Sequence, residues 1–364
     1  MKFLLYFRGF MHSVYRLLDA ASNRVAEGYR VVEDICRFVL DDEKAGSKLK
    51  EARQILRLMI SQIADNVVLL SERDTDEDLG KKWVGVQEYK RTDFAEIVTA
   101  NFKRIQEGLR SIEEFTKQLE TEKTAGLAKK IEHMRYRSYV LEKDINHKVS
   151  IEYLSNLNFT LIFNPNACLT EPWELLDSVL SAGIDSVQFR VKDYLEKEQD
   201  ALNLARKTQE ICKKHEIPLI INDRADWALI LGADGLHVGQ NDLGIDDSRK
   251  ILHVNQIIGL SIACAQDLDV AAASKADYFG VGALFDTKTK HYDVTPGLDL
   301  YKKALGILEK PVFGIGGITE HNLLKVKQIA QNADKSLRIC VSSAILRAKN
   351  PAKVTENMRR IIDE

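Results

Sequence analysis

Eight short apolar runs, rich in β-branched residues, alternate with segments of helical periodicity after residue 158. Runs of this length without polar alternation are typical of strands buried on both faces, as in parallel sheets covered by helices. Eight such units within residues 159–364 predict a small (β/α)8 barrel, an α/β fold. The expected strands begin at Phe159, Ser186, Pro218, Gly235, Ile257, Tyr278, Pro311 and Arg338.

The first half of the chain has a different period. Apolar residues recur at helical spacing from about Arg16 to Asn146, and this stretch contains no proline, so helix is expected throughout. A chain of 364 residues exceeds the usual size of a single core. We therefore predict an all-helical domain over 1–148, a linker over 149–158 and the barrel over 159–364.

An internal repeat lies within the helical half, because residues 19–34 and 99–114 align without gaps at an offset of 80. Six residues of the first copy, Ala20, Arg24, Glu27, Gly28, Arg30 and Glu33, recur as Ala100, Arg104, Glu107, Gly108, Arg110 and Glu113. A mid-helix glycine costs about 1 kcal/mol relative to alanine, so its repetition predicts close approach of another backbone. We expect two helical hairpins that cross near these glycines. The repeated Arg and Glu residues form a solvated ladder, bond across the crossing or face a ligand.

Composition narrows the class of protein. The formal net charge is -2, which gives no general attraction to nucleic acid or to a membrane. The 5 cysteines are widely spaced and include no CxxC pair, which favours a reducing cytoplasm over a disulfide framework. The opening MKFLLYFRGF is too short to span a bilayer, and we expect a frayed start. Small molecules are the expected partners, and a homo-oligomer is left open.

Polar side chains lie at the carboxyl ends of the expected strands, where (β/α)8 barrels have their active sites. On the second strand, Gln188, Arg190 and Lys192 share one face, because successive side chains alternate. A packed interior does not accept unpaired cations. If this face turns inward, the cations lie at the barrel mouth and bind an anion. The alternative is that they point outward and pair with acids of the helix layer.

Two carboxylates follow the neighbouring strands. The third strand ends in Asn222 and Asp223, and Asp242 follows the fourth. Mg²⁺ is commonly held by one or two carboxylates together with substrate and water. The pair therefore suits one magnesium ion that bridges phosphate oxygens, although turn-forming aspartates are also common after strands. His237, beside glycines on the fourth strand, is expected in the core.

The remaining strands contribute a loop and two small-residue motifs. The polar connection after the sixth strand contains three candidate ligands, Thr287, Thr289 and Lys290, and it either closes over a substrate or is merely solvated. GIGG, residues 314–317, ends the seventh strand, and Ser342 and Ser343 end the eighth. Backbone amides after strands seven and eight often bind phosphate in these barrels. A diphosphate site and a separate monophosphate site together suit a two-substrate transferase.

The ordered motifs QFRVK, INDRADWAL, ADGLHVGQNDL, GLS, FDTKTK, GIGGI and VSSAI resemble those of thiamine-phosphate synthases over residues 159–347. This family joins 4-amino-2-methyl-5-(diphosphooxymethyl)pyrimidine to 4-methyl-5-(2-phosphooxyethyl)thiazole and releases pyrophosphate. The resemblance implies a magnesium-dependent transferase of thiamine biosynthesis.

The resemblance also implies roles for particular residues. It assigns the pyrimidine diphosphate to Gln188, Arg190, Lys192, Asn222, Ser261 and Lys290, and one Mg²⁺ to Asp223 and Asp242. It assigns the thiazole phosphate to Thr287, Thr289, Gly317, Ser342 and Ser343. The expected catalytic residues are Arg190, Lys192, Ser261 and Lys290, because a dissociative reaction requires the charge of the leaving group to be neutralised and needs no strong base.

Other functions stay open. The helical half resembles an extension fused ahead of this synthase in some bacteria and associated with phosphorylating the pyrimidine phosphate. The sequence has no GxxxxGK[ST] motif, so a kinase and a regulatory module are both considered. For the barrel, the alternatives are a thiazole tautomerase of the same fold and a non-catalytic ligand-binding protein. Tautomerases resemble one another in having histidine where this chain has Ala263, which argues against the first.

Overall fold

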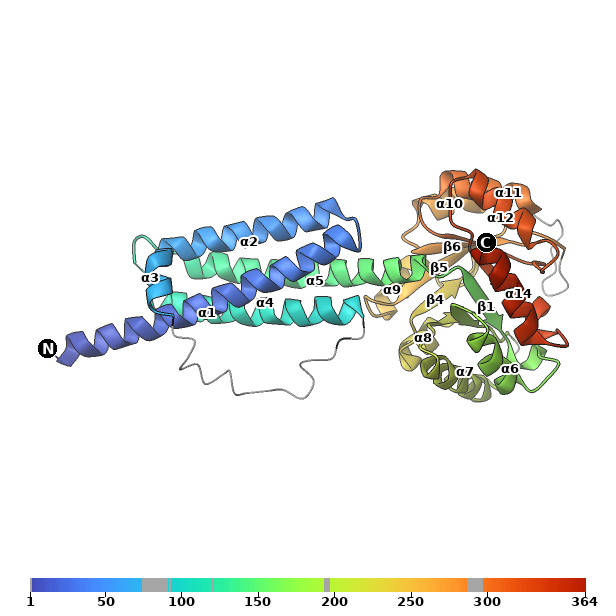
Figure 1. Ribbon diagram of the computed structural model, residues 1–364, viewed down its shortest axis with the longest axis horizontal. Coiled ribbons are helices and arrows are strands. Elements are labelled where there is room, and N and C mark those ends of the chain that lie inside the picture. The colour runs from blue at the N-terminus through green and yellow to red at the C-terminus, as the bar shows by residue number, and fades with distance from the viewer. Residues whose placement is uncertain (1, 74–90, 92, 120, 193–196, 287–296) are drawn as a thin grey trace. The chain divides into compact units, whose positions relative to one another are not determined.

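The computed structural model describes residues 2–73, 91, 93–119, 121–192, 197–286 and 297–364, without the side chains of 2–10, 154 and 155 (Figure 1). The chain divides into two compact units, residues 1–149 and 150–364. None of the helices among these described residues combines the length and the apolar character needed to cross a bilayer.

The first unit is built from helices, as predicted: α1 (Lys2–Phe38), α2 (Glu43–Ile63), α3 (Asn66–Ser71), α4 (Phe94–Lys117) and most of α5 (Leu127–Ser155). We expected a frayed start, but the chain is helical from Lys2. Capping carboxylates begin two of the helices, because Asp42 accepts from the Ala45 N–H at 2.9 Å and Asp93 accepts from the Glu96 N–H at 2.8 Å.

The repeated glycines lie where α1 crosses α4, as predicted. A Cβ atom on Gly28 would lie 2.8 Å from Cγ1 of Ile105, and one on Gly108 would lie 2.5 Å from Cγ2 of Val25. The symmetry of these contacts follows the sequence repeat. Only a hydrogen atom fits at either position without displacing the facing helix.

The repeated acids pair within each hairpin and not across the crossing. Buried Glu33 on α1 accepts from Arg53 of α2 at 2.7 Å, and buried Glu113 on α4 lies 3.1 Å from Arg135 of α5. Arg30 and Arg110 add a second cation to each acid. Arg24 and Arg104, in contrast, are exposed and have no ion-pair partner among the described residues.

The second unit is a closed barrel of eight parallel strands in chain order, which confirms the predicted fold class. The strands are β1 (Phe159–Phe163), β2 (Ser186–Phe189), β3 (Leu219–Asn222), β4 (Gly235–Val238), β5 (Ile257–Ile262), β6 (Tyr278–Gly282), β7 (Val312–Ile315) and β8 (Ile339–Val341). Each coincides with an expected strand. The eighth is shorter than predicted, because Ser343 already begins a helix.

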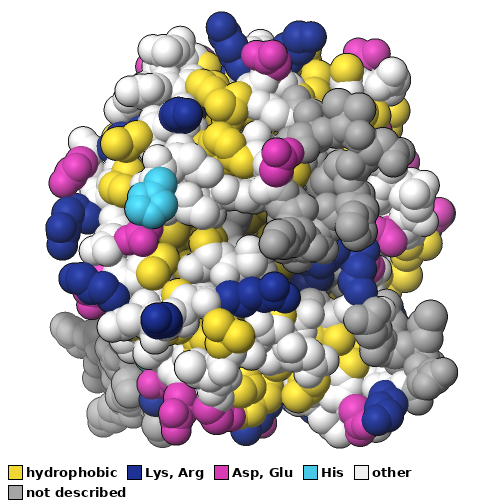
Figure 2. Space-filling model, turned by 90° about the vertical axis from the view of Figure 1, so that its right-hand side faces the viewer, with side chains coloured by type: hydrophobic (Ala, Val, Ile, Leu, Met, Phe, Trp, Pro, Cys, Tyr) yellow, Lys and Arg dark blue, Asp and Glu magenta, His cyan; other side chains and the backbone are white. Residues whose placement is uncertain are grey.

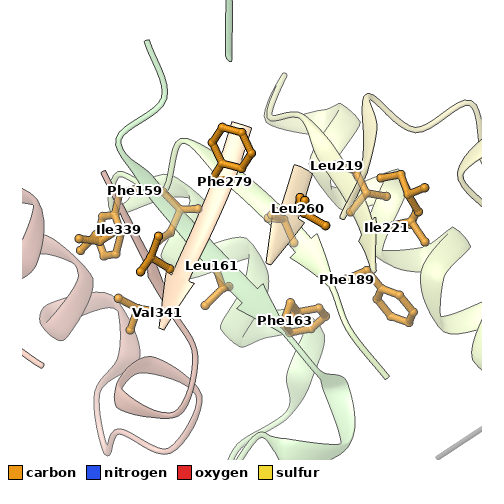
Figure 3. Packing of buried hydrophobic residues seen from close by; sticks show 14 of the residues in the cluster. Phe159, Leu161, Phe163, Phe189, Leu219, Ile221, Leu260, Phe279, Ile339 and Val341 are labelled. Carbon is orange, nitrogen blue, oxygen red and sulfur yellow. The ribbon is translucent and has the colours of Figure 1, made fainter. Parts of the chain in front are cut away.

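Helices cover the outside of the barrel (Figure 1). They are η2 (Pro165–Ala167), α6 (Pro172–Ser181), α7 (Glu198–Lys214), α8 (Ala225–Leu231), α9 (Ile245–Ile251), α10 (Gln266–Ala273), α11 (Gly297–Ile307), α12 (Leu323–Asn332), α13 (Ser343–Leu346) and α14 (Pro351–Asp363). Large apolar side chains of the strands, such as Phe159, Leu161 and Phe163, fill the layer beneath these helices (Figure 3).

Alternate strand residues form a second, smaller core inside the barrel. Ile162, Ile220, Tyr278 and Phe313 belong to this interior cluster. Ile151 of the last turns of α5 also packs against it, so the connection expected over 149–158 is helical as far as Ser155. The apolar contact made by Ile151 explains why a segment with a polar composition continues as helix.

Candidate active site

One pocket at the carboxyl ends of the strands gathers the predicted site residues. It has a volume of about 320 Å³ and is lined by all the predicted residues that the structure describes: Gln188, Arg190, Lys192, Asn222, Asp223, Asp242, Ser261, Gly317, Ser342 and Ser343. The other predicted residues, Thr287, Thr289 and Lys290, lie outside the described residues. Figure 2 shows a face of the molecule on which Lys and Arg side chains lie beside a hollow.

The face of β2 that carries Gln188 turns into the barrel, since Gln188 is buried and lines the pocket. The chain continues to Arg190, whose N–H donates to the Phe163 carbonyl at 2.9 Å. Nζ of Lys192 lies 3.5 Å from Oδ2 of Asp223. No carboxylate of the described residues pairs with the Arg190 guanidinium. The cations therefore point to the mouth and not to the helix layer.

Asp223 and Asp242 share a small region beside these cations. Asp223 has a φ of 63°, and its N–H donates to the His237 carbonyl at 2.8 Å. Burial raises the pKa of Asp223, a hydrogen bond with Asp242 raises it further, and Lys192 opposes this shift. Asp242 in turn accepts from the Gly239 N–H at 2.7 Å, which fixes its loop.

This pair of carboxylates fits a divalent cation that takes its other ligands from substrate and water. Asp223 and Asp242 are close enough to raise the pKa of Asp223, so a bound cation would stabilise the ionised form of both carboxyl groups. Within the described ranges, no cluster of three or more His, Cys, Asp or Glu residues forms a complete metal cage. Mg²⁺ requires no such cage, because it usually keeps waters and binds phosphate oxygens.

Ser261 is hydrogen-bonded to His237 and Gln240, two residues that the sequence did not assign to the site. His237 is 8% exposed, as expected for a core residue, yet its Nε2 lies 2.9 Å from Oγ of Ser261. Gln240 Nε2 donates to the Ser261 carbonyl at 2.9 Å. Strand alternation gave a usable signal for His237, because it lies two residues after Gly235 and so on the same face of the strand. The structure then places it directly opposite Asn222 in the sheet register.

The opposite side of the pocket is made by loops after β7 and β8. Gly316 and Gly317 have φ values of 94° and 68°, a left-handed conformation that favours glycine. A Cβ atom on Gly317 would also lie 2.7 Å from the Asp286 carbonyl oxygen. Ser342 Oγ donates to the Ile162 carbonyl at 2.9 Å, so its proton is already used within the chain.

Comparisons with known proteins identify the family of this chain. The family model for thiamine monophosphate synthase matches residues 159–345. The thiamine-phosphate synthase of Thermosynechococcus vestitus is 33% identical over 96% of this chain and 95% of its own. That of Synechocystis sp. is 32% identical over 95% of each chain. The chain belongs to the thiamine-phosphate synthase family. The predicted family and the predicted enzyme class, a transferase, are thereby confirmed.

The match to thiamine-phosphate synthases extends to a solved structure and to the helical half. The thiamine phosphate pyrophosphorylase from Pyrococcus furiosus has a TM-score of 0.50 and 26% identity, and the alignment covers 58% of this chain and 98% of that one. The model of the ThiD2 family matches residues 16–144. The helical half is therefore an addition to the synthase domain, as the sequence repeat and the change of period indicate.

Proposed function

We propose that the barrel mouth couples the pyrimidine diphosphate to the thiazole phosphate and releases pyrophosphate, through the residues assigned above. One observation carries this assignment: the Arg190 guanidinium, unpaired among the described residues, shares a pocket with Lys192 and with two adjacent carboxylates. A diphosphate, with or without a divalent cation, is the kind of ligand that satisfies both signs of charge.

In the proposed reaction, the bond between the pyrimidine methylene carbon and the diphosphate oxygen breaks, and its electron pair leaves with the diphosphate. The lone pair of the thiazole nitrogen then forms the new C–N bond to the methylene cation. Arg190 and Lys192 neutralise the charge that develops on the leaving group. Mg²⁺ held by Asp223 and Asp242 would supply further positive charge to the same oxygens.

The loops after β7 and β8 are proposed to bind the thiazole phosphate. Gly317 supports this assignment because it lines the pocket and carries no side chain there, and Ser343 lies at the start of α13. Ser342 is proposed to line the thiazole phosphate site without donating its hydroxyl proton to the phosphate, since this hydroxyl already donates to the Ile162 carbonyl. A tautomerase is a weaker candidate, because Ala263 lines the pocket and carries no group able to accept a proton.

The helical half is proposed to phosphorylate the pyrimidine phosphate that the barrel then consumes, and a regulatory module is the alternative. Its match to the ThiD2 family supports this proposal, as do the exposed cations Arg24 and Arg104. The kinase proposal predicts ATP-dependent formation of the pyrimidine diphosphate by the full chain, with loss of this activity when both Arg24 and Arg104 are replaced by alanine.

We also propose a cytoplasmic location, since all five cysteines are free thiols.

Titration of Mg²⁺ tests the metal assignment. We expect excess EDTA to abolish coupling, and Asp223→Asn to require at least about tenfold more Mg²⁺ for half-maximal rate, since one charged ligand is lost. Asp269→Asn, on an exposed position of α10, is the matched control and should behave as wild type. Full coupling activity in excess EDTA would remove the metal from the proposal.

A further inference from the structure

A hydrogen-bonded column of three side chains runs through the barrel interior to the mouth. The Tyr278 hydroxyl on β6 lies 3.0 Å from Nδ1 of His237 on β4, and Nε2 of His237 lies 2.9 Å from Oγ of Ser261 on β5. Glycines make room for it, because a Cβ atom on Gly259 would collide with the Tyr278 ring and would lie 2.5 Å from Nδ1 of His237. The proposed reaction uses only the last member, Ser261.

Burial of Tyr278 decides the direction of the first hydrogen bond. Tyr278 is 9% exposed, and burial raises the pKa of its hydroxyl well above its usual range, so the phenol keeps its proton. In the part of the chain that the structure describes, Nδ1 of His237 is the one acceptor within reach of this hydroxyl. A buried donor without an acceptor is costly. Tyr278 therefore donates, and Nδ1 carries no proton.

The second hydrogen bond follows from the first. A neutral imidazole with a bare Nδ1 carries its proton on Nε2. Nε2–H then donates to Oγ of Ser261, which occupies an acceptor site of that hydroxyl. The hydroxyl proton of Ser261 is left available to an acceptor in the pocket that Ser261 lines.

We infer that Tyr278 and His237 are positioning residues that fix Ser261 as a hydrogen-bond donor toward an anionic substrate oxygen in the mouth. The opposite imidazole tautomer would take the proton of Ser261 and leave only lone pairs facing a negatively charged group. The identity of the acceptor rests on the proposed function, as an oxygen of the pyrimidine diphosphate. The direction of the column does not, since it follows from the interior contacts alone.

Two amide substitutions of His237 in the full chain separate this role from packing. The glutamine amide nitrogen reaches the place of Nε2 and still donates to Ser261, whereas the shorter asparagine amide reaches only the place of Nδ1. We expect His237→Asn to lower kcat/KM for the pyrimidine diphosphate on the order of 10- to 100-fold, the value of a hydrogen bond to a charged group. His237→Gln should stay within about threefold of wild type. Equal losses in the two variants would overturn the inference.

A double-mutant cycle gives a readout that a merely structural role would not produce. Ser261→Ala should cost about as much as His237→Asn, and adding His237→Asn to Ser261→Ala should cost nothing further, because both remove one interaction. Additive losses would contradict the inference.

Nitrogen-15 NMR of the histidine rings tests the column without any substrate. The inference requires the Nε2–H tautomer of His237 in the wild-type chain and a change of its Nδ1 signal in Tyr278→Phe. An Nδ1–H tautomer in the wild type would overturn it. If the Nε2–H tautomer is found in a chain that does not couple its substrates, the inferred direction stands and the proposed function fails.

Discussion

Gly28 and Gly108 show at the scale of single residues how the helical repeat sets a packing distance. Each faces backbone as well as side chain of the other helix: Gly28 the Asn101 carbonyl at 3.1 Å, and Gly108 the Ala21 carbonyl at 3.2 Å from an added Cβ atom. Backbone atoms cannot rotate away as a side-chain terminus can. An alanine at either site therefore forces α1 and α4 apart.

We expect Gly28→Ala and Gly108→Ala each to destabilise the helical unit by about 1–3 kcal/mol, the usual cost of overpacking. This loss outweighs the gain of about 1 kcal/mol in helix propensity. Gly46→Ala on α2 is the control, because its Cβ atom would meet Cγ of Arg37 at 3.4 Å and Cβ of Cys36 at 3.8 Å, which are ordinary contacts with side chains. Urea denaturation of the three variants measures the difference, and a Gly28→Ala variant as stable as Gly46→Ala would contradict the packing argument.

Arg190 is the residue whose removal should cost most in the barrel. It is the cation of the mouth without an ion-pair partner among the described residues, so its charge is available to the leaving diphosphate. Arg190→Ala should lower kcat by about 10² or more, as loss of a positioned charge-stabilising group does. Arg206→Ala, exposed on α7 and away from the pocket lining, should leave the rate unchanged. Steady-state rates of the two variants decide this point.

Asp42 connects two helices at the scale of elements. It caps α2 through the Ala45 N–H, and it binds Nζ of Lys148 on α5 at 2.7 Å. Partial burial raises the pKa of Asp42, but the hydrogen bonds from Lys148 and Ala45 lower it by more, so the net shift is downward. A carboxyl with a lowered pKa in the folded state stabilises the fold above its unfolded pKa and loses this effect as the pH falls.

We expect Asp42→Ala to cost about 0.5–2 kcal/mol near neutral pH, the value of an N-cap. The difference from wild type should shrink below about pH 4, where the unfolded carboxyl takes up a proton. Asp42→Asn keeps the capping oxygen without the charge, so its stability should vary less with pH than that of wild type. Urea denaturation between pH 3 and 7 provides the measurement, and a constant difference across this range would contradict the account.

Local periodicity predicted the elements well, and tertiary contacts account for what it left out. Each strand was located because a doubly buried strand is apolar along its whole length. The pairing of His237 with Ser261 and Tyr278 was not predicted, since these partners lie 24 and 41 positions away. The helical course of 150–155 goes with the interior contact of Ile151, and β8 ends at Val341 because α13 begins at Ser343.

At the scale of the whole molecule, the proposed coupling chemistry lies within one unit. All described residues of the mouth fall within 150–364. A chain beginning at Ser150 should therefore fold and couple its substrates at a rate within a few-fold of the full chain. A chain beginning at Asn158 lacks Ile151 and Leu157, which line a hollow at the amino ends of the strands. It should be less stable by about 1–3 kcal/mol, since apolar burial is lost.

Thermal unfolding and coupling rates of the two shortened chains test this division. A soluble, folded chain from Ser150 that is inactive, while the full chain is active, would mean that the helical half completes the active site.

The most direct test of the proposed coupling reaction is to measure pyrophosphate and thiamine phosphate together. The full chain is incubated with the pyrimidine diphosphate, the thiazole phosphate and Mg²⁺, and with each component omitted in turn. The proposed reaction should yield both products in equal amounts, and only when all three components are present. A folded protein that yields no pyrophosphate under these conditions, or that isomerises the thiazole without the pyrimidine, would contradict it.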